Sequence, residues 1–188
     1  MKLPNHTALK EWASVISALG AGDQVVLLRK GGIADPTFGI EADRFYLFPT
    51  FLHQKERQFK PSFVRHFLGT DRADENPEHV PIELWCEVAA VFRVRELGLL
   101  HQVEPFVIFE RDTIEERFRF RPDQLVHVIA VRAFRLPHPV EVINRSEYAG
   151  CRSWISVDES IDVDGSVPVL PDSELEQRVG ELQRILSS

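Results

Sequence analysis

The 188-residue sequence lacks the features of a disulfide scaffold, a membrane-spanning chain or a secreted precursor. Its two cysteines, Cys86 and Cys151, are too few for a disulfide framework and lack the spacing of a metal-binding motif. No apolar run approaches the roughly 20 residues of a bilayer-spanning helix, and no secretory pattern opens the chain. These absences favour a cytoplasmic protein without a membrane partner.

Positive charge is also scarce, because 22 Lys and Arg residues face 29 Asp and Glu residues and leave a formal net charge of −7. Sequence-independent binding to nucleic acid normally requires a broad basic surface, which such a chain lacks. The charge is uneven, however. Residues 53–66 carry four Lys or Arg against one Glu, whereas residues 71–87 carry six Asp or Glu against one Arg. A local basic face is therefore still compatible with the acidic composition.

The remaining composition is that of an ordinary globular protein, with 44% hydrophobic and 27% charged residues. Thirteen Phe and a single Met predict a core of aromatic and branched side chains. A chain of this length can bury such a core within one domain. We expect a single domain over residues 1–159, with residues 160–188 forming a surface excursion and a C-terminal helix docked on that domain.

Hydrophobic periodicity predicts a mixture of helices and strands. Helices are expected over residues 7–19, 51–58, 61–68 and 173–186, and one helical turn over residues 144–148. Strands are expected over residues 25–28, 45–48, 82–94, 106–109, 125–136 and 154–157. Two segments stay open, since residues 83–90 and 113–121 fit either periodicity.

Several residues mark where these elements should begin and end. Thr7 can cap the first helix, which Gly20 and Gly22 should terminate. Pro137 and Pro139 should end the strand over residues 125–136. At the last helix, Ser173 and Glu176 have the spacing of a capping box.

The strongest candidate site begins where the first apolar strand ends, at the run Arg29-Lys30-Gly31-Gly32. The two cations supply charge, and the glycines let backbone N–H groups approach phosphate oxygens. The spacing is not that of a P-loop, in which Gly and Lys are followed by Ser or Thr. The alternative is a solvated strand end followed by a tight turn.

A second group of polar residues follows the next strand, namely Thr50, His53, Gln54 and Lys55. A hydroxyl, an imidazole and an amide within four residues can read a base edge or orient water. Helix capping by Thr50 with a solvated His53 is an equal alternative. We expect Arg29 and His53 to line one cleft, which requires the loop after Arg29 to fold back between adjacent strands.

No residue pattern supports a catalytic or metal centre. Metal-dependent nuclease chemistry would need a motif such as Glu-x-Lys, which does not occur in the chain. Cys151 lies beside Arg152, which would favour a thiolate, but a packed turn is the simpler interpretation. We therefore assign no catalytic residue, metal ligand or cofactor, and the sequence does not decide whether the protein is an enzyme.

Several separated blocks resemble an uncharacterised prokaryotic family of domains of unknown function. The blocks are Ala8-Leu9-Lys10-Glu11-Trp12, Leu27-Leu28-Arg29-Lys30-Gly31-Gly32-Ile33, Phe48-Pro49-Thr50, His53-Gln54 and Tyr148-Ala149-Gly150-Cys151-Arg152-Ser153-Trp154. The helix pattern containing Trp12, followed by Gly22 and then Leu28-Arg29-Lys30, is also similar to the opening of the ASCH branch of PUA-like domains. Those domains are small β-barrels that mostly bind RNA or modified bases.

This second resemblance implies an α+β domain whose mixed or antiparallel sheet curls into a PUA-like β-barrel with flanking helices. The function that it implies is binding of a nucleotide, RNA or DNA, without catalysis. A nucleic-acid-processing hydrolase and a non-catalytic protein-interaction module are the alternatives, and the oligomeric state is open.

Overall fold

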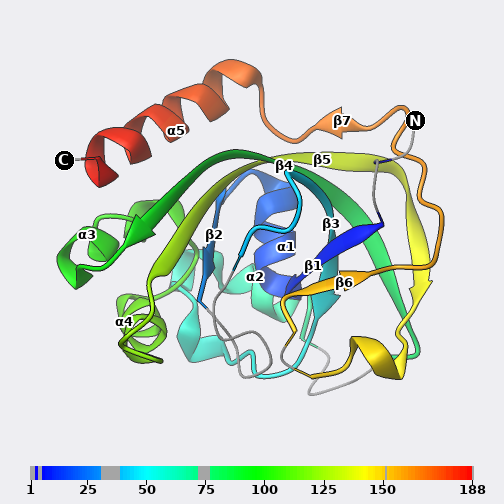
Figure 1. Cartoon of the computed structure of the whole chain (residues 1–188), viewed down its shortest axis with the longest axis horizontal. Helices are drawn as coiled ribbons and strands as arrows, with labels where there is room; N and C mark the ends of the chain where they lie inside the picture. The colour runs from blue at the N-terminus through cyan, green and yellow to red at the C-terminus, as the bar shows by residue number, and fades with distance from the viewer. Residues whose placement is uncertain (1–2, 4–5, 31–38, 72–76, 151, 188) are drawn as a thin grey trace.

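Two long antiparallel strands, β4 (His79–Val94) and β5 (Val126–Ile143), pair with each other inside the sheet (Figure 1). The computed structural model describes residues 3, 6–30, 39–71, 77–150 and 152–187. The other strands within this part of the chain are β1 (Thr7–Trp12), β2 (Val26–Arg29), β3 (Arg44–Thr50), β6 (Trp154–Ser156) and β7 (Val167–Pro168). They complete one sheet in the order β2-β5-β4-β3-β1-β6, with β7 paired to β5. The sheet is mixed, because β1 and β3 run parallel whereas the other pairs are antiparallel.

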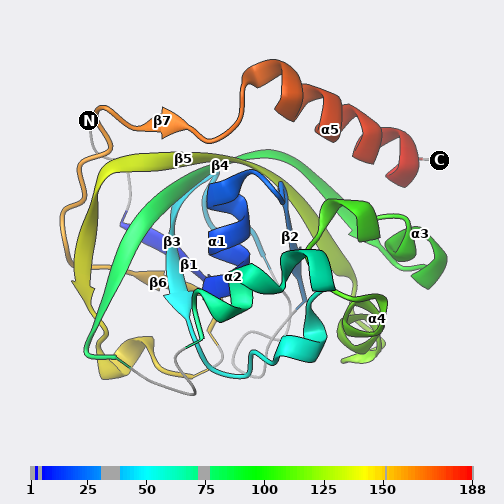
Figure 2. The ribbon, with the colours of Figure 1, turned by 180° about the vertical axis from the view of Figure 1, so that it is seen from behind.

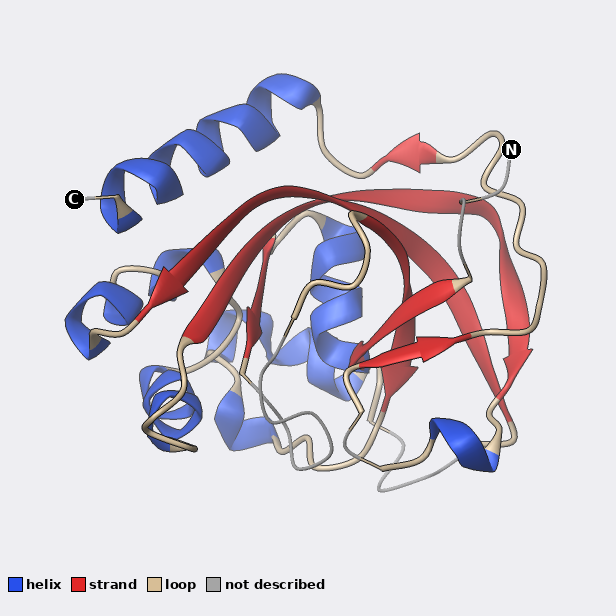
Figure 3. Ribbon diagram, viewed as in Figure 1, coloured by secondary structure: helices blue, strands red, loops and turns tan. Residues whose placement is uncertain are grey.

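The sheet curls because the pairing of β4 with β5 is interrupted twice. Between Val88 and Ala90 the register shifts by one residue, and between Ile82 and Leu84 it skips residues 136–139 of β5. Bulges of this kind bend a sheet and increase its twist. The resulting half-barrel wraps around helix α1 (Ala13–Ala21), as Figure 3 shows. The predicted α+β class with a curled sheet and flanking helices is therefore confirmed.

We had predicted that Pro137 and Pro139 end this strand, but β5 continues past them to Ile143. The second interruption explains why. Pro137 and Pro139 fall in the skipped segment, opposite no residue of β4. Proline lacks the N–H that a ladder needs, so it is tolerated where the pairing is broken. Pairing then resumes at Val140 and continues to Ile143.

The predicted helix over residues 7–19 is wrong in its first half. Residues 7–12 form β1, which pairs with β3 on one edge and β6 on the other. Ala8 and Leu9 are fully buried there, so long-range pairing outweighs the local helical pattern, and Thr7 belongs to the strand instead of capping a helix. The predicted stop is confirmed, since Gly22 ends α1 with a left-handed φ of 76°.

The remaining helices are α2 (Val64–Leu68), α3 (Leu97–His101), α4 (Arg111–Arg119) and α5 (Asp172–Leu186). Residues 113–121, which fitted either periodicity, thus lie mostly in α4. The predicted strand over residues 106–109 is absent, because the 3-10 helix Glu104–Phe106 comes first and Phe109 forms only an isolated bridge with Phe59. Residues 51–58 are helical only in the 3-10 turn Glu56–Gln58. A 3-10 turn also occupies Ser146–Tyr148.

Helix α5 packs on the outer side of the sheet, opposite α1 and α2 (Figures 1 and 2). Leu175 and Leu182 are buried in the main core cluster, and Val179 and Ile185 pack against it. The predicted capping box does not form, because Pro171 is the N-cap and makes no side-chain hydrogen bond. None of the helices in the described part of the chain is long and apolar enough to cross a bilayer.

Candidate functional site

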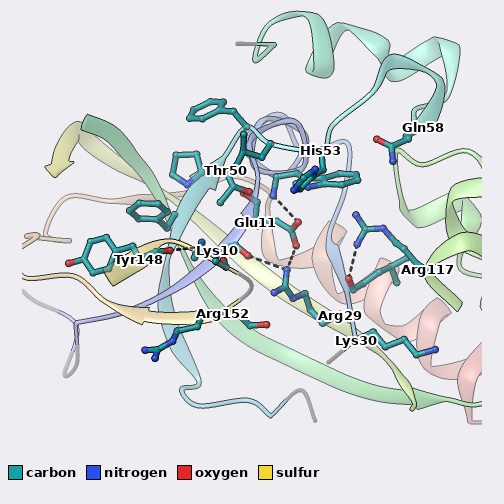
Figure 4. Close-up of a pocket in the computed structure, with 18 of the residues that line it drawn as sticks. Lys10, Glu11, Arg29, Lys30, Thr50, His53, Gln58, Arg117, Tyr148 and Arg152 are labelled. Carbon is teal, nitrogen blue, oxygen red and sulfur yellow. Dashed lines mark hydrogen bonds and ion pairs between the residues drawn. The ribbon is translucent and has the colours of Figure 1, made fainter. Parts of the chain in front are cut away.

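A cavity of about 810 Å³ opens where the ends of β1, β2 and β3 meet α4 and the segment after β5 (Figure 4). Its lining is mostly apolar and includes five aromatic side chains: Trp12, Phe48, Phe51, Phe120 and Tyr148. The polar and charged lining residues are Lys10, Glu11, Arg29, Lys30, Thr50, His53, Gln58, Thr113, Glu116, Arg117, Asn144, Arg152 and Ser153. A pocket of this volume accommodates a small ligand or part of a larger one.

Four of the residues predicted to bind a ligand line this cavity: Arg29, Lys30, Thr50 and His53. Arg29 and His53 thus share one cavity, as the sequence predicted, but not for the reason given. Strands β2 and β3 are not neighbours, since β5 and β4 lie between them. The curl of the sheet instead brings the end of β2 to the end of β1.

The other four predicted residues, Gly31, Gly32, Gln54 and Lys55, are not among the described residues that line the cavity. Gln54 accepts hydrogen bonds from the Ser14 N–H at 3.1 Å and the Ser14 hydroxyl at 2.6 Å. Its side-chain oxygen therefore binds the first turn of α1. Lys55 is exposed and is not among the residues that line the cavity. Gly31 and Gly32 lie outside the described residues.

Glu11 forms the buried centre of the polar lining. Its side chain is 4% exposed, and its Oε2 accepts a hydrogen bond from Arg29 Nη1 at 3.2 Å within an ion pair. Glu11 Oε1 accepts from the backbone N–H of Trp12 at 2.8 Å. Arg29 also donates to the Lys10 carbonyl at 3.1 Å and thereby ties β2 to β1. This buried pair closes the half-barrel between two strands that share no ladder in the described structure.

Arg117 places a second guanidinium group near the same carboxylate. It lies over the rings of Trp12 and Phe109, each centroid 4.5 Å away, and its Nη1 donates to the Leu28 carbonyl at 3.4 Å. Burial lowers the pKa of Arg117, which the charge of Glu11 raises and that of Arg29 lowers further. One carboxylate therefore faces two cations.

Three more cations among the described residues line the cavity. Lys10 Nζ donates to the carbonyls of Tyr148 at 2.5 Å and Gly150 at 2.9 Å. Lys30 Nζ donates to the Phe118 carbonyl at 2.5 Å, and burial lowers the pKa of this lysine. Arg152 is exposed and lines the cavity. Among the described residues of the lining, five cations against two carboxylates leave an excess of three positive charges in a chain of net charge −7.

The rim of the cavity carries exposed apolar groups and one unusual backbone conformation. Leu52 is 40% and Phe120 50% exposed, and both line the opening. His53 has a φ of 68°, in the left-handed region that few residues other than glycine adopt. Such conformations concentrate at functional sites.

Sequence reasoning missed Lys10, Glu11 and Arg117 as site residues, because they lay in segments predicted as helix or left open. Their signal was weak. Glu11 is a charged residue between the apolar positions Leu9 and Trp12, which is unusual for a chain segment buried on both edges.

A separate polar cluster joins α1 to α2 away from the cavity. His66 is buried, with Nε2 2.7 Å from Asp23 Oδ2 and Nδ1 2.9 Å from Ser17 Oγ. If Nε2 donates to the carboxylate, Nδ1 accepts from the serine hydroxyl, as in a catalytic triad with the two ring nitrogens exchanged. None of the three residues lines the cavity, and the cluster holds two helices together.

The sequence offered no metal or thiol centre, and the described residues hold no group of three or more His, Cys, Asp or Glu side chains placed to bind a metal ion. Cys86 is fully buried, and burial strongly raises the pKa of its thiol. Its thiolate is therefore inaccessible as a nucleophile. Cys151 lies outside the described residues.

Comparison with known proteins gives the fold and the family. Among solved structures, a serine-to-alanine variant of the ASCH protein from Zymomonas mobilis is similar, with a TM-score of 0.50, 10% identity, and 96% of this chain and 99% of that chain covered. The unsubstituted ASCH protein from Zymomonas mobilis matches with a TM-score of 0.48, 11% identity and 93% of each chain covered. A search of curated proteins gave no significant match.

The curled sheet and flanking helices are thus those of an ASCH-like, PUA-like fold. A family model described as "Domain of unknown function (DUF1802)" matches residues 8–181, which include every described residue of the cavity lining. The chain therefore belongs to the DUF1802 family.

Proposed function

We propose that the protein binds a nucleotide or nucleic-acid element in this cavity and does not catalyse a reaction on it. The observation that carries the proposal is the excess of positive charge on the cavity lining of an otherwise acidic chain. An anionic ligand would be attracted to this site and repelled by most of the remaining surface.

The walls suit a ligand that combines negative charge with flat apolar rings. Phe120 is half exposed and Trp12 partly exposed, so both offer aromatic surface, and stacking on such surface contributes about 1–3 kcal/mol per base. Cations beside the aromatic rings then face the phosphates. The ASCH branch of PUA-like domains, whose fold the chain resembles, mostly binds RNA or modified bases, which favours RNA among the possible ligands.

The non-catalytic part of the proposal rests on how the reactive groups are occupied. Both carboxylate oxygens of Glu11 accept hydrogen bonds from protein donors. The Thr50 hydroxyl donates to the Glu11 carbonyl at 3.0 Å. A carboxylate and a hydroxyl held in this way position the strands instead of activating water.

The test is binding of a fluorescent single-stranded RNA, followed by anisotropy at salt concentrations from about 50 to 200 mM. The variant is Lys30→Gln with Arg152→Gln, which removes two lining cations without touching the Arg29–Glu11 pair. The matched control is Arg95→Gln with Arg184→Gln, which removes two exposed cations outside the cavity.

We expect the cavity variant to lose at least tenfold in affinity and the control to lose less than twofold. The slope of log K against log salt should become shallower by about 1.4 in the cavity variant, since each phosphate that a cation neutralises contributes about 0.7 for a single strand. Absence of wild-type binding to RNA or DNA at the lowest salt would refute the proposal and favour a protein-interaction module.

A further inference from the structure

The turn that follows β3, over residues 50–54, is fixed by hydrogen bonds to two other elements. The side-chain amide nitrogen of Gln54 donates to the carbonyls of Thr50 at 3.3 Å and Phe51 at 3.2 Å, which closes the turn on itself. The side-chain oxygen of Gln54 accepts from the N–H and the hydroxyl of Ser14, at the start of α1. The Thr50 hydroxyl donates to the backbone of β1 at 3.0 Å. The turn is therefore held against α1 and β1 at once.

His53 lies within this turn in a conformation that its side chain disfavours. Its φ of 68° falls in the left-handed region, which glycine adopts without strain. Strain of this kind persists only where surrounding contacts enforce it, and the bonds of Gln54 are such contacts. The His53 side chain is exposed, lines the cavity and forms no hydrogen bond or ion pair with the described residues. Within that part of the chain, the strained imidazole thus gives the fold no polar contact in return.

The place of His53 in the cavity suits a contact with a base. Figure 4 shows His53 on one side of the Glu11–Arg29 ion pair, and Lys30 and Arg152 on the other. A nucleotide with its phosphate beside those two cations reaches His53 with its base. A neutral imidazole has one donor and one acceptor nitrogen, which match the polar groups on the edge of an unpaired base.

From this arrangement we infer that His53 hydrogen-bonds to the edge of a bound base, and that Gln54 is the residue that positions it. The inference rests on the function proposed above and names a residue that selects among bases. A contact to a base edge depends on which base is present, whereas a contact to a phosphate does not. A base contact also leaves the salt dependence of binding unchanged, because it neutralises no phosphate.

The experiment measures binding of three fluorescent RNA homopolymers, oligo(A), oligo(C) and oligo(U), by anisotropy over a range of salt concentrations. His53→Ala and His53→Gly both remove the imidazole, but only glycine also removes the backbone strain. The matched control is His138→Ala, which removes an exposed imidazole of β5 outside the cavity.

We expect both His53 variants to bind the tightest homopolymer about fivefold more weakly, as for the loss of one hydrogen bond. The ratio between the tightest and the weakest homopolymer should fall at least by half. The slope of log K against log salt should stay the same, whereas loss of a phosphate contact would make it shallower by about 0.7. His53→Gly should melt about 2–4 °C above His53→Ala, because only alanine keeps the strain. The control should bind as the wild type does.

A double-mutant cycle tests the positioning role of Gln54. Gln54→Ala should weaken binding by about the same factor as His53→Ala, but by less than about twofold when His53 is already alanine, since no imidazole is left to position. Its effect on thermal stability should be the same in both backgrounds. Gln54→Glu, which keeps an acceptor for Ser14, takes its place if the alanine variant does not fold.

The outcomes that contradict the inference are distinguishable. Unchanged affinity in both His53 variants refutes the His53 contact and leaves the proposed function intact. A shallower salt slope in His53→Ala assigns the contact to a phosphate, and an equal loss for all three homopolymers assigns it to stacking; either result refutes reading of a base edge. Equal losses of affinity from Gln54→Ala in both backgrounds refute its positioning role. Absence of wild-type binding to every homopolymer refutes the proposed function itself.

Discussion

Replacing Glu11 with glutamine tests whether its charge supports the fold at the expense of ligand binding. The carboxylate is 4% exposed and accepts from two donors, Trp12 N–H at 2.8 Å and Arg29 Nη1 at 3.2 Å. Glutamine has nearly the same shape but only one acceptor oxygen, so one of these donors loses its partner. The substitution also removes the Glu11 charge from beside the guanidinium groups of Arg29 and Arg117.

The expected loss of stability is about 3 kcal/mol. Leaving a buried donor unsatisfied costs about 1–3 kcal/mol, and breaking a buried ion pair costs about 3–5 kcal/mol. In a chain of this length each kcal/mol lowers Tm by about 2–4 °C, so Tm should fall by about 6–12 °C.

Affinity should change in the opposite direction. The excess of positive charge on the lining rises by one, and unit charges on the order of 10 Å apart at intermediate screening interact by about 1 kcal/mol. RNA binding by Glu11→Gln should therefore strengthen by about two- to tenfold, when it is measured well below the lowered Tm.

The assays are urea unfolding and RNA anisotropy on the same preparation, with Glu181→Gln on α5 as control. Glu181 is exposed, so the control makes the same change in net charge and should alter neither quantity. Wild-type stability in Glu11→Gln would show that the carboxylate is not needed between the two guanidinium groups. Weaker RNA binding by the folded variant would show that Glu11 contacts the ligand favourably, contrary to the charge argument.

Three further predictions concern other parts of the molecule. Because burial lowers the pKa of Lys30 from 10.5, Lys30 loses its charge at a lower pH than an ordinary lysine. Binding of a DNA oligonucleotide should therefore weaken as pH rises through that lowered pKa. If Lys30→Arg leaves the pH dependence of binding unchanged, this prediction is wrong. His66→Ala should cost about 1–3 kcal/mol in urea unfolding by breaking the contacts with Ser17 and Asp23, and any loss of RNA affinity in the folded variant would give the cluster a role beyond structure. Leu182→Ala in α5 should cost about 2–5 kcal/mol by leaving a cavity in the core, whereas unchanged thermal unfolding would mean that the helix does not support the domain.

The sequence predicted correctly those strands whose pattern of apolar residues is local. Its predictions were wrong where pairing with strands distant in the sequence determines the structure. Strands β2 and β3 were found because short apolar runs between turn residues leave few alternatives, and β4 was predicted from its alternation although residues 83–90 also fitted a helix. Strand β1 was predicted as helix, because its apolar spacing continues into α1 and nothing local shows that β3 and β6 flank it. The passage of β5 through Pro137 and Pro139 likewise depends on where β4 stops pairing with it.

The candidate site was predictable in its position but not in its composition. Arg29 and Lys30 stood out as cations at the end of a buried strand, and their position at the cavity follows from that. Arg152 was noticed only as the neighbour of Cys151. Arg117 comes from α4, whose proximity to β2 results from the curl of the whole sheet, so no local pattern could have joined it to the site.

Arg29, the residue with the strongest sequence signal, lines the cavity and also joins two strands. Arg29 was predicted as a phosphate contact, yet its guanidinium donates to Lys10 and Glu11 and joins two strands that share no ladder. A ligand that took this guanidinium would have to break a buried ion pair, which is costly. Lys30 donates to the Phe118 carbonyl and Arg152 is exposed, so an approaching phosphate can bind these two cations without breaking the Arg29–Glu11 ion pair. Arg29 thus holds β2 to β1, and Lys30 and Arg152 are the lining cations that we propose to contact the ligand.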